Sequence, residues 1–294
     1  MKSKRIFTFI IFVSILITIT GCQGQRYSDV TVTYIASDGY LIQSADKKVL
    51  IDAIFNIEGD EQYYYGPSDS TLEKMEQALP PFDDIDIVFV THRHFDHFDP
   101  VSAARHLESN RDAILVGPSQ VFEMLRDSCS NFELISERVI ALAPEKDLWV
   151  EIVISDISIR ALGLAHGSYM ITDEETGEQY DKHAHTQNLG YLFTINGNNI
   201  MHIGDARLKN HESCFQKLRD EGVKTDILFI GFYDISAESQ NVFFNIIEPE
   251  EIVFMHFTPD AKVQEQYINI FKEHMPDAHI LLEPFDSFQY KRQE

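Results

Sequence analysis

Apolar and polar residues alternate along the chain from position 30 to position 51, and this spacing predicts antiparallel strands. The segments are Val30–Ile35, Gly39–Ile42 and Lys48–Ile51, the last followed by Asp52. Ile85–Val90 differs from them because it is apolar at nearly every position, which is typical of a strand covered on both faces. The first third of the chain therefore predicts a sheet that includes a buried interior strand.

The second half of the chain has a similar pattern of strand-like segments. Its strand-like segments are Trp149–Ile154, Ile157–Leu164, Leu189–Ile195, Asn199–Ile203, Ile227–Ile230 and Ile252–Met255. Asn196-Gly197 separates two of them and is the strongest short signal for a hairpin in the sequence. Residues 166 to 187 are largely polar and predict an excursion from the sheet.

Apolar residues at helical spacing lie between the strands. Leu72, Met75 and Leu79 mark one amphipathic helix, which Pro80-Pro81 should stop. Further helical segments begin at Asp99-Pro100, span Pro118–Leu125, and contain Val263, Tyr267 and Phe271. Because the strands fall into two groups with helices after them, the pattern predicts an α/β fold with two packed sheets and external helices.

The N-terminal residues predict a targeting segment. Lys2, Lys4 and Arg5 precede an apolar run from Ile6 to Ile19, which is short for a membrane span and typical of a secretory signal. Ile19-Thr20-Gly21-Cys22 resembles a bacterial lipobox, which implies cleavage before Cys22 and a lipid on its thiol. We expect a signal peptide at 1–21, a tether at 22–29 and a single domain at 30–294. The alternative is an uncleaved N-terminal anchor helix. In either case the domain would lie outside the cytoplasm, tethered to a membrane.

Composition limits the partners. The chain has 294 residues, of which 44% are hydrophobic, so it can form one large core. Its net charge of −23 becomes −26 when the signal, with its three basic residues, is removed. Such a charge repels nucleic-acid phosphates, so no nucleic-acid partner is expected. Cys129 and Cys214 could pair in an oxidising compartment, but the sequence does not place them together.

The strongest chemical signal is a cluster of histidines directly after the apolar strand Ile85–Val90. His92, His94, Asp96 and His97 fall within six residues. Imidazole nitrogens suit zinc and similar metals, and a carboxylate helps to neutralise a second cation. A tight loop could direct His92 and His94 to one ion and Asp96 and His97 to another. Two such ions could share a hydroxide, because metals lower the pKa of bound water towards ~7.

This His-x-His-x-Asp-His pattern resembles the signature of the metallo-β-lactamase superfamily. Leu50-Ile51-Asp52, Gly204-Asp205 and Met255-His256 match further family motifs in the same order. The resemblance implies a four-layer αβ/βα sandwich with two divalent ions at the strand-end edge, zinc first and manganese or iron as alternatives. It implies that Asp205 bridges the ions. The implied metal ligands are His92, His94, Asp96, His97, His166, Asp205 and His256.

The third histidine of the first site has two candidates. His166 follows the strand Ile157–Leu164, a placement that resembles lactonase-like members of the superfamily. His185 is the alternative, and together with His183 it could instead line the pocket. Asp52 is expected to accept a hydrogen bond that orients a ligand, although an ordinary turn carboxylate would also fit its position.

The resemblance implies a hydrolase of small molecules. In this interpretation a metal-bridging hydroxide attacks an ester, lactone or similar acyl substrate, and Asp96 acts as a catalytic residue that orients the hydroxide and accepts its proton. The matching branch includes ascorbate-6-phosphate lactonase and N-acyl phosphatidylethanolamine phospholipase D, so a phosphodiesterase is the alternative. A non-catalytic lipoprotein that binds metal or another ligand is the alternative from a different class.

Overall fold

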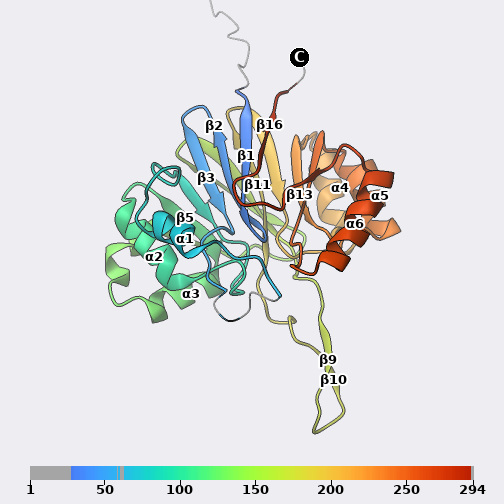
Figure 1. Cartoon of the computed structure of the whole chain (residues 1–294), viewed down its shortest axis with the longest axis horizontal. Helices are drawn as coiled ribbons and strands as arrows, with labels where there is room; N and C mark the ends of the chain where they lie inside the picture. The colour runs from blue at the N-terminus through green and yellow to red at the C-terminus, as the bar shows by residue number, and fades with distance from the viewer. Residues whose placement is uncertain (1–27, 58, 60–62, 293–294) are drawn as a thin grey trace, which may run out of the picture.

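The computed structural model describes residues 28–57, 59 and 63–292. The expected signal peptide, Cys22 and most of the expected tether lie outside these residues. The described chain forms two seven-stranded sheets that pack face to face, with helices on both outer faces (Figure 1). This is the four-layer α/β arrangement that the sequence predicts.

The first sheet has the order β16-β1-β2-β3-β4-β5-β6. Its strands are β1 (Val30–Ala36), β2 (Gly39–Ser44), β3 (Lys47–Ile51), β4 (Ile87–Phe89), β5 (Ile114–Pro118), β6 (Val139–Leu142) and β16 (Ser287–Tyr290). The neighbours from β3 to β6 are parallel, whereas β16, β1, β2 and β3 pair antiparallel. The strands from β3 to β5 therefore end at one edge of the sheet.

The second sheet has the order β15-β14-β13-β12-β11-β8-β7. Its strands are β7 (Trp149–Ile154), β8 (Ile157–Gly163), β11 (Leu189–Ile195), β12 (Asn198–His202), β13 (Ile227–Gly231), β14 (Glu251–Met255) and β15 (His279–Ile280). The run from β12 to β15 is parallel, and β7, β8, β11 and β12 pair antiparallel. Asn196 and Gly197 form the turn between β11 and β12, both with positive φ, as the sequence predicts.

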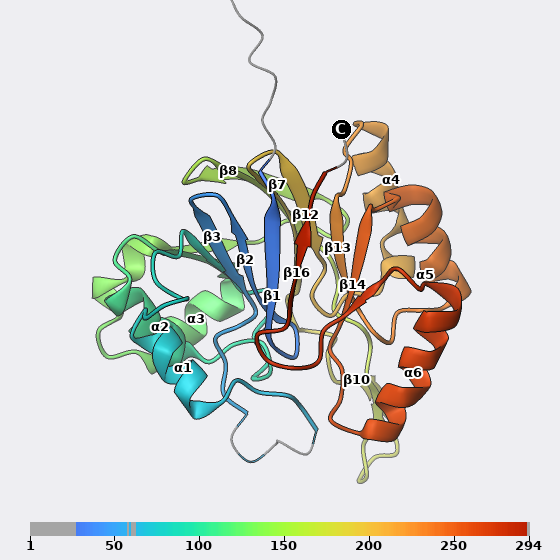
Figure 2. The same ribbon diagram turned by 45° about the horizontal axis from the view of Figure 1, so that its top comes forward.

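Helices cover each sheet on its outer face, three on each within the described part of the chain (Figure 2). They are α1 (Asp69–Glu76), α2 (Pro100–Ser109) and α3 (Ser119–Ser128) on the first sheet, and α4 (Glu212–Asp220), α5 (Ala237–Val242) and α6 (Ala261–His274) on the second. Short helical turns are η1 (Phe132–Leu134), η2 (Ser136–Arg138), η3 (Leu208–Asn210) and η4 (Phe243–Ile247). Asp99 caps α2 by accepting a hydrogen bond from the backbone N–H of Ser102, and Pro100 begins the helix, as the sequence predicts.

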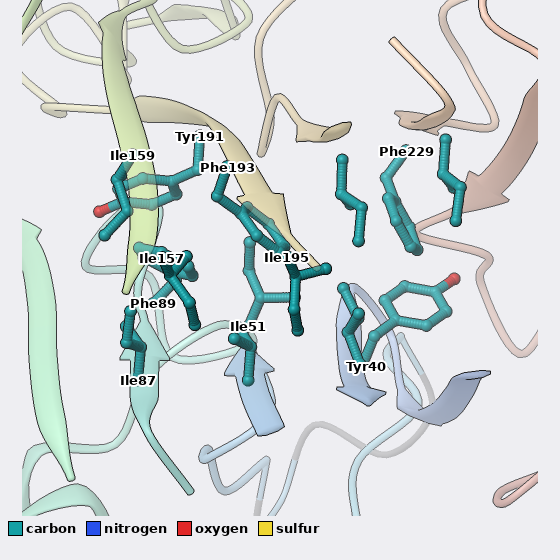
Figure 3. Packing of buried hydrophobic residues seen from close by; sticks show 14 of the residues in the cluster. Tyr40, Ile51, Ile87, Phe89, Ile157, Ile159, Tyr191, Phe193, Ile195 and Phe229 are labelled. Atoms are coloured by element: carbon teal, nitrogen blue, oxygen red, sulfur yellow. The ribbon is translucent and has the colours of Figure 1, made fainter. Parts of the chain in front are cut away.

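The central core lies between the two sheets (Figure 3). Tyr40 of the first sheet contacts Phe229 of the second, with ring centroids 4.7 Å apart, and Phe89 contacts Tyr191 at 4.4 Å. Each such fully buried side chain contributes about 1.5–3 kcal/mol through the hydrophobic effect. Because all four are fully buried or nearly so, the sheets cannot slide without separating these pairs. The strand ends that carry polar residues are therefore held in fixed relative positions.

Several elements differ from the sequence-based expectations. The polar excursion contains a hairpin of β9 (Met170–Thr172) and β10 (Gln179–Asp181), which projects from the body of the molecule (Figure 1). The strands β6, β15 and β16 were not predicted. Helix α1 ends at Glu76, before Leu79, because Ala78 turns the backbone to a φ of 48°.

Cys129 and Cys214 are both free. Cys129 packs on the helical side of the first sheet and Cys214 on the helical side of the second, so the pair that the sequence left open does not form. Among the residues that the structure describes, no helix has the length and apolar character needed to cross a membrane.

Candidate metal centre

Polar side chains from both sheets meet at the edge where the parallel strands end. The loop after β4 contributes His92, His94 and His97. The ends of β8, β12 and β14 lead to His166, Asp205 and His256, and the turn between β1 and β2 supplies Asp38. Carboxyl ends of parallel strands are where ligands gather in open α/β sheets. Segments from Asp38 to His256 therefore contribute to one cluster.

The cluster divides into two groups that share Asp205. His92, His94, His166 and Asp205 form the first group, and Asp38, His97, Asp205 and His256 form the second. In each group one potential ligand atom per residue lies within 4.8 Å of all the others. Two cations could therefore bind side by side, with Asp205 between them. Of the seven ligands that the sequence predicts, six belong to these groups.

Hydrogen bonds in the first group determine which ring nitrogens face inward. Oγ1 of Thr91 donates its only hydrogen to Asp52 at 2.5 Å, so it accepts from Nδ1 of His92 at 3.0 Å. Nδ1 of His166 donates to the carbonyl oxygen of Gly167 at 2.7 Å. The Nε2 lone pairs of both histidines are therefore free for a metal.

His94 completes the first group, and it faces His92 through Nδ1, whereas His92 and His166 face the cluster through Nε2. Its Nδ1 lies 3.0 Å from Nε2 of His92, and its Nε2 lies 3.4 Å from Oγ1 of Thr186. With the proton of His92 on Nδ1, the Nε2 atom that faces His94 carries a lone pair. A cation between the imidazoles would satisfy both rings.

Asp52 holds the loop and one ligand of the second group. Its carboxylate accepts from the backbone N–H of Thr91 at 2.7 Å and from Nδ1 of His97 at 2.9 Å. The latter bond leaves Nε2 of His97 directed at the cluster. Asp52 is only 1% exposed. It has the geometry expected for a residue that orients a metal ligand rather than for an ordinary turn carboxylate.

Asp205 owes its position to the glycine before it. Gly204 has a φ of 56°, and a Cβ atom there would lie 2.5 Å from Oδ1 of Asn188 and 2.8 Å from Cβ of Thr91. Only glycine fits this close approach. The hydroxyl of Tyr233 then donates to Oδ1 of Asp205 at 3.0 Å, while Oδ2 lies 3.2 Å from Nε2 of His166 and 3.3 Å from Nε2 of His256.

Asp38 belongs to the second group, although the sequence did not predict it. It lies in the turn between β1 and β2, is completely buried, and places Oδ2 at 3.1 Å from Nε2 of His97 and 3.7 Å from Nε2 of His256. One available signal was an acidic residue in a turn at the same sheet edge as Asp52. That signal is weak, because aspartate is common in turns.

Asp96 and the other histidines take different positions. Oδ2 of Asp96 lies 3.5 Å from Nε2 of His256 and 3.8 Å from Nε2 of His97, so it borders the second group rather than belonging to it. The side chain of His185 is exposed and lies outside both groups, so the structure brings His166 and not His185 to the cluster. His183 packs against His166, with ring centroids 4.2 Å apart.

The two groups differ in their electrostatics. Burial, together with the neighbouring imidazole of His166, lowers the pKa of His94 to about 3. Burial also lowers the pKa of His97, but the carboxylates of Asp205, Asp96 and Asp38 outweigh it and raise that pKa to about 10. His92, whose pKa burial also lowers, and His94 are therefore neutral nitrogen donors, whereas the second group attracts positive charge.

The donor set fits a pair of divalent cations. Nε2 of His97, Nε2 of His166 and both carboxylate oxygens of Asp38 are buried and have no hydrogen-bond partner among the described residues. Leaving such atoms unsatisfied costs about 1–3 kcal/mol each, and more when they are charged. Imidazole and carboxylate are the usual ligands of catalytic zinc and of related metals. Metal binding would satisfy these atoms together.

A cavity of about 580 Å³ opens above the cluster. Its walls include Tyr64, Phe95, Tyr169 and Tyr233, and two cationic side chains, Lys182 and Arg207, also line it. The guanidinium carbon of Arg207 lies 3.8 Å from the ring centroid of Tyr233, and its Nη1 donates to the Tyr233 carbonyl oxygen at 2.9 Å. The cavity is therefore aromatic with positive charge at its side, in a protein of strongly negative net charge.

Solved structures with the same fold include two that are described as hydrolases. A novel metallo hydrolase from Ignicoccus hospitalis is 14% identical, with a TM-score of 0.57 over 90% of this chain and 100% of that one. An isothiocyanate hydrolase from Delia radicum gut bacteria is 16% identical, with a TM-score of 0.56 over 88% and 98%. Unliganded yeast PDE1 is 12% identical, with a TM-score of 0.51 over 88% and 98%.

A search of curated proteins gave no match to the chain. The model of the β-lactamase superfamily domain matches residues 47–275, which include the metal-centre residues other than Asp38 and ten of the fourteen strands of the two sheets. With two packed sheets and two histidine–aspartate groups at the strand ends, the chain belongs to the metallo-β-lactamase superfamily.

Proposed function

We propose that the protein is a binuclear metal-dependent hydrolase that acts on a small ester, lactone or related acyl substrate. One observation carries this proposal: two ligand groups share Asp205 at the base of a cavity that is large enough for a small molecule. A protein that only captures a ligand has little need for two adjacent metal sites that open to the same cavity.

The metal ligands in this proposal are the seven residues expected from the sequence, of which Asp96 is the one outside the two compact groups. Two bound divalent ions, most simply zinc, supply an activated water and polarise the oxygen of the substrate. Asp96 lies at the border of the second group and on the wall of the cavity. Its free carboxylate oxygen can orient the attacking water and accept its proton.

The cavity walls indicate what kind of molecule could bind. Tyr169 and Tyr233 offer flat apolar surfaces, and Lys182 and Arg207 offer positive charge beside them. Arg207 is held against Tyr233 and cannot turn freely, so it can fix the position of an anionic group. We infer that the substrate carries a negative charge near the bond that is cleaved.

The same positive charges favour one alternative, a phosphodiesterase. A phosphodiester is itself anionic, and arginine is well suited to bind phosphate. The two reactions differ in the electrophilic atom, carbon or phosphorus, which the arrangement of ligands does not select.

We further propose that the protein is an extracytoplasmic lipoprotein attached through Cys22. The strand β1 begins at the end of the molecule opposite the β9–β10 hairpin (Figure 1). The candidate metal centre lies at the hairpin end, because β9 begins at Met170, shortly after His166. A lipid anchor before β1 would therefore leave the cavity facing away from the membrane.

Substrate panels test the proposed function. Soluble protein that begins after Cys22, loaded with zinc or manganese, would be assayed with lactones, aryl esters and bis-nitrophenyl phosphate. We expect hydrolysis of the carbonyl substrates, and the variant His94→Ala would serve as the inactive control. Preference for the phosphate ester would establish the alternative. No turnover with any substrate at full metal occupancy would indicate a binding protein and contradict the proposal.

A further inference from the structure

We propose that Asp38 is a direct ligand of the second metal ion, which makes the two sites unequal: one is histidine-rich and binds zinc preferentially, and the other is carboxylate-rich and favours Mn²⁺ or Fe²⁺. The inference rests on the proposed binuclear centre and deepens it. It assigns Asp38, which the histidine-based motif does not include, to the metal site.

The position of Asp38 is fixed from several sides. The backbone carbonyl oxygen of Asp38 accepts from Nε2 of His202 at 3.2 Å, and Nδ1 of His202 accepts from the N–H of Gly204 at 3.1 Å. The next residue, Gly39, packs so closely that a Cβ atom there would lie 2.8 Å from the backbone of Asp52 and Ala53. The turn that carries Asp38 therefore contacts the end of β12 and the residues that follow β3. Asp205 and Asp52, two other parts of the site, lie just beyond these strand ends.

The proton positions leave Asp38 facing a lone pair. Nδ1 of His97 donates to Asp52 at 2.9 Å, so in the neutral ring Nε2 has no hydrogen. Oδ2 of Asp38 lies 3.1 Å from this Nε2 atom. A positive charge is therefore needed between these two atoms: the second proton of His97 supplies it in the metal-free protein, and a bound metal ion would take the place of that proton. Both oxygens of Asp38 are buried and make no hydrogen bond within the described chain.

Asp38 has no exposed surface, and carboxylates are almost never buried completely unless they are paired or bind a metal. The imidazoles of His97 and His256 are its nearest partners of opposite potential charge, and both belong to the same ligand group. A metal ion bound to these histidines would lie within reach of Asp38 as well.

The resulting ligand sets differ in kind. The first group has three imidazoles and the shared carboxylate of Asp205. The second has two imidazoles with the carboxylates of Asp38 and Asp205, and Asp96 lies at its border. Imidazole suits zinc, whereas carboxylate oxygen suits harder ions such as manganese. The extra carboxylate also neutralises more of the charge of the second ion.

Metal competition on the full chain in detergent tests the proposal. Chelator-treated protein would be titrated with Zn²⁺ and Mn²⁺, separately and together, and bound Mn²⁺ would be followed by electron paramagnetic resonance. We expect two ions per chain, with Mn²⁺ retained in one site when both metals are present. In Asp38→Asn, we expect the Mn²⁺ affinity of that site to fall by about 100-fold, at or above the upper end of the effect of losing an outer-shell partner.

Two further variants separate ligation from a structural role. Asp156→Asn removes an exposed carboxylate from the β7–β8 turn and should leave both affinities unchanged. Asp38→His should still bind two ions but should now prefer Zn²⁺ in both sites. Equal losses of Zn²⁺ and Mn²⁺ affinity in both Asp38 variants would contradict direct ligation.

Thermal melting gives an independent readout. Metal should raise the melting temperature of Asp38→Asn less than it raises that of the unmodified protein, because the variant lacks one ligand of the second ion. An equal rise with metal in the two proteins would overturn the proposal. If the unmodified protein bound no metal, the proposed function itself would fail.

Discussion

The two ligand groups share Asp205 yet are built differently. In the first, Nδ1 of His92 and Nδ1 of His166 each donate to an oxygen, and burial lowers the pKa of His92 and of His94. In the second, buried carboxylates surround His97 and His256 and raise their pKa values. The first group is thus preorganised for a metal, whereas the second needs a positive charge to be stable. The comparison teaches that a single motif can contribute ligands to two sites, one in which burial lowers histidine pKa values and one in which carboxylates raise them.

Removing His94 should have the largest effect on metal binding and hydrolysis. His94→Ala deletes a nitrogen donor of the first group only, so we expect that group to lose its ion and hydrolysis to fall by more than about 100-fold, beyond the effect typical of an outer-shell change. Elemental analysis should then find close to one ion per chain in place of two. Retention of both ions would show that the first group does not depend on His94.

Asp52→Asn should act on the second group. It weakens the hydrogen bond that orients His97, and outer partners of this kind typically change metal affinity by about 10–100-fold. The first ion should be affected less, since Asp52 contacts His97 directly but reaches His92 only through the hydroxyl of Thr91. Isothermal titration with each metal would measure both affinities, and an equal loss at both sites would argue against separate groups.

Gly204→Ala should weaken both groups together, because it displaces the residue that they share. The positive φ and the close contact with Asn188 predict a loss in the free energy of unfolding on the order of 1–3 kcal/mol. Denaturant unfolding of the metal-free protein would measure it. As a control, Gly222→Ala has a similar φ of 77° with open space around the site, so it isolates the backbone cost from the steric one.

The smallest expected effect is the dependence of the melting temperature on pH. The pKa of His97 is about 10 in the folded protein, above its ordinary value of 6.5. The folded state then binds this proton more tightly than the unfolded state, so the contribution of His97 is complete below pH 6.5 and is lost as pH rises towards 10. We expect the melting temperature of metal-free protein to fall across that range, and metal-loaded protein to change less. An unchanged melting temperature in the metal-free form would contradict this.

The sequence predicted most strands and the motif loop because these signals are local. Apolar alternation and a continuous apolar run reflect burial on one or two faces, and the spacing of His92, His94 and His97 lies within a single loop. The structure also bears out the fold class.

Asp38 and β16 escaped prediction because their roles depend on distant contacts. Asp38 has the sequence context of any turn aspartate, and only the folding of β14 and the motif loop around it makes it buried. The strand β16 pairs with β1 across the full length of the domain, with Val30 opposite Tyr290, and its four residues carry too little apolar pattern to be recognised.

The most direct test of the account is anomalous diffraction from crystals grown with bound zinc and manganese. We expect two metal peaks on either side of Asp205, one in contact with His92, His94 and His166, and the other with His97, His256 and Asp38. A single peak, or a second peak away from Asp205, would contradict the shared binuclear centre on which the account depends.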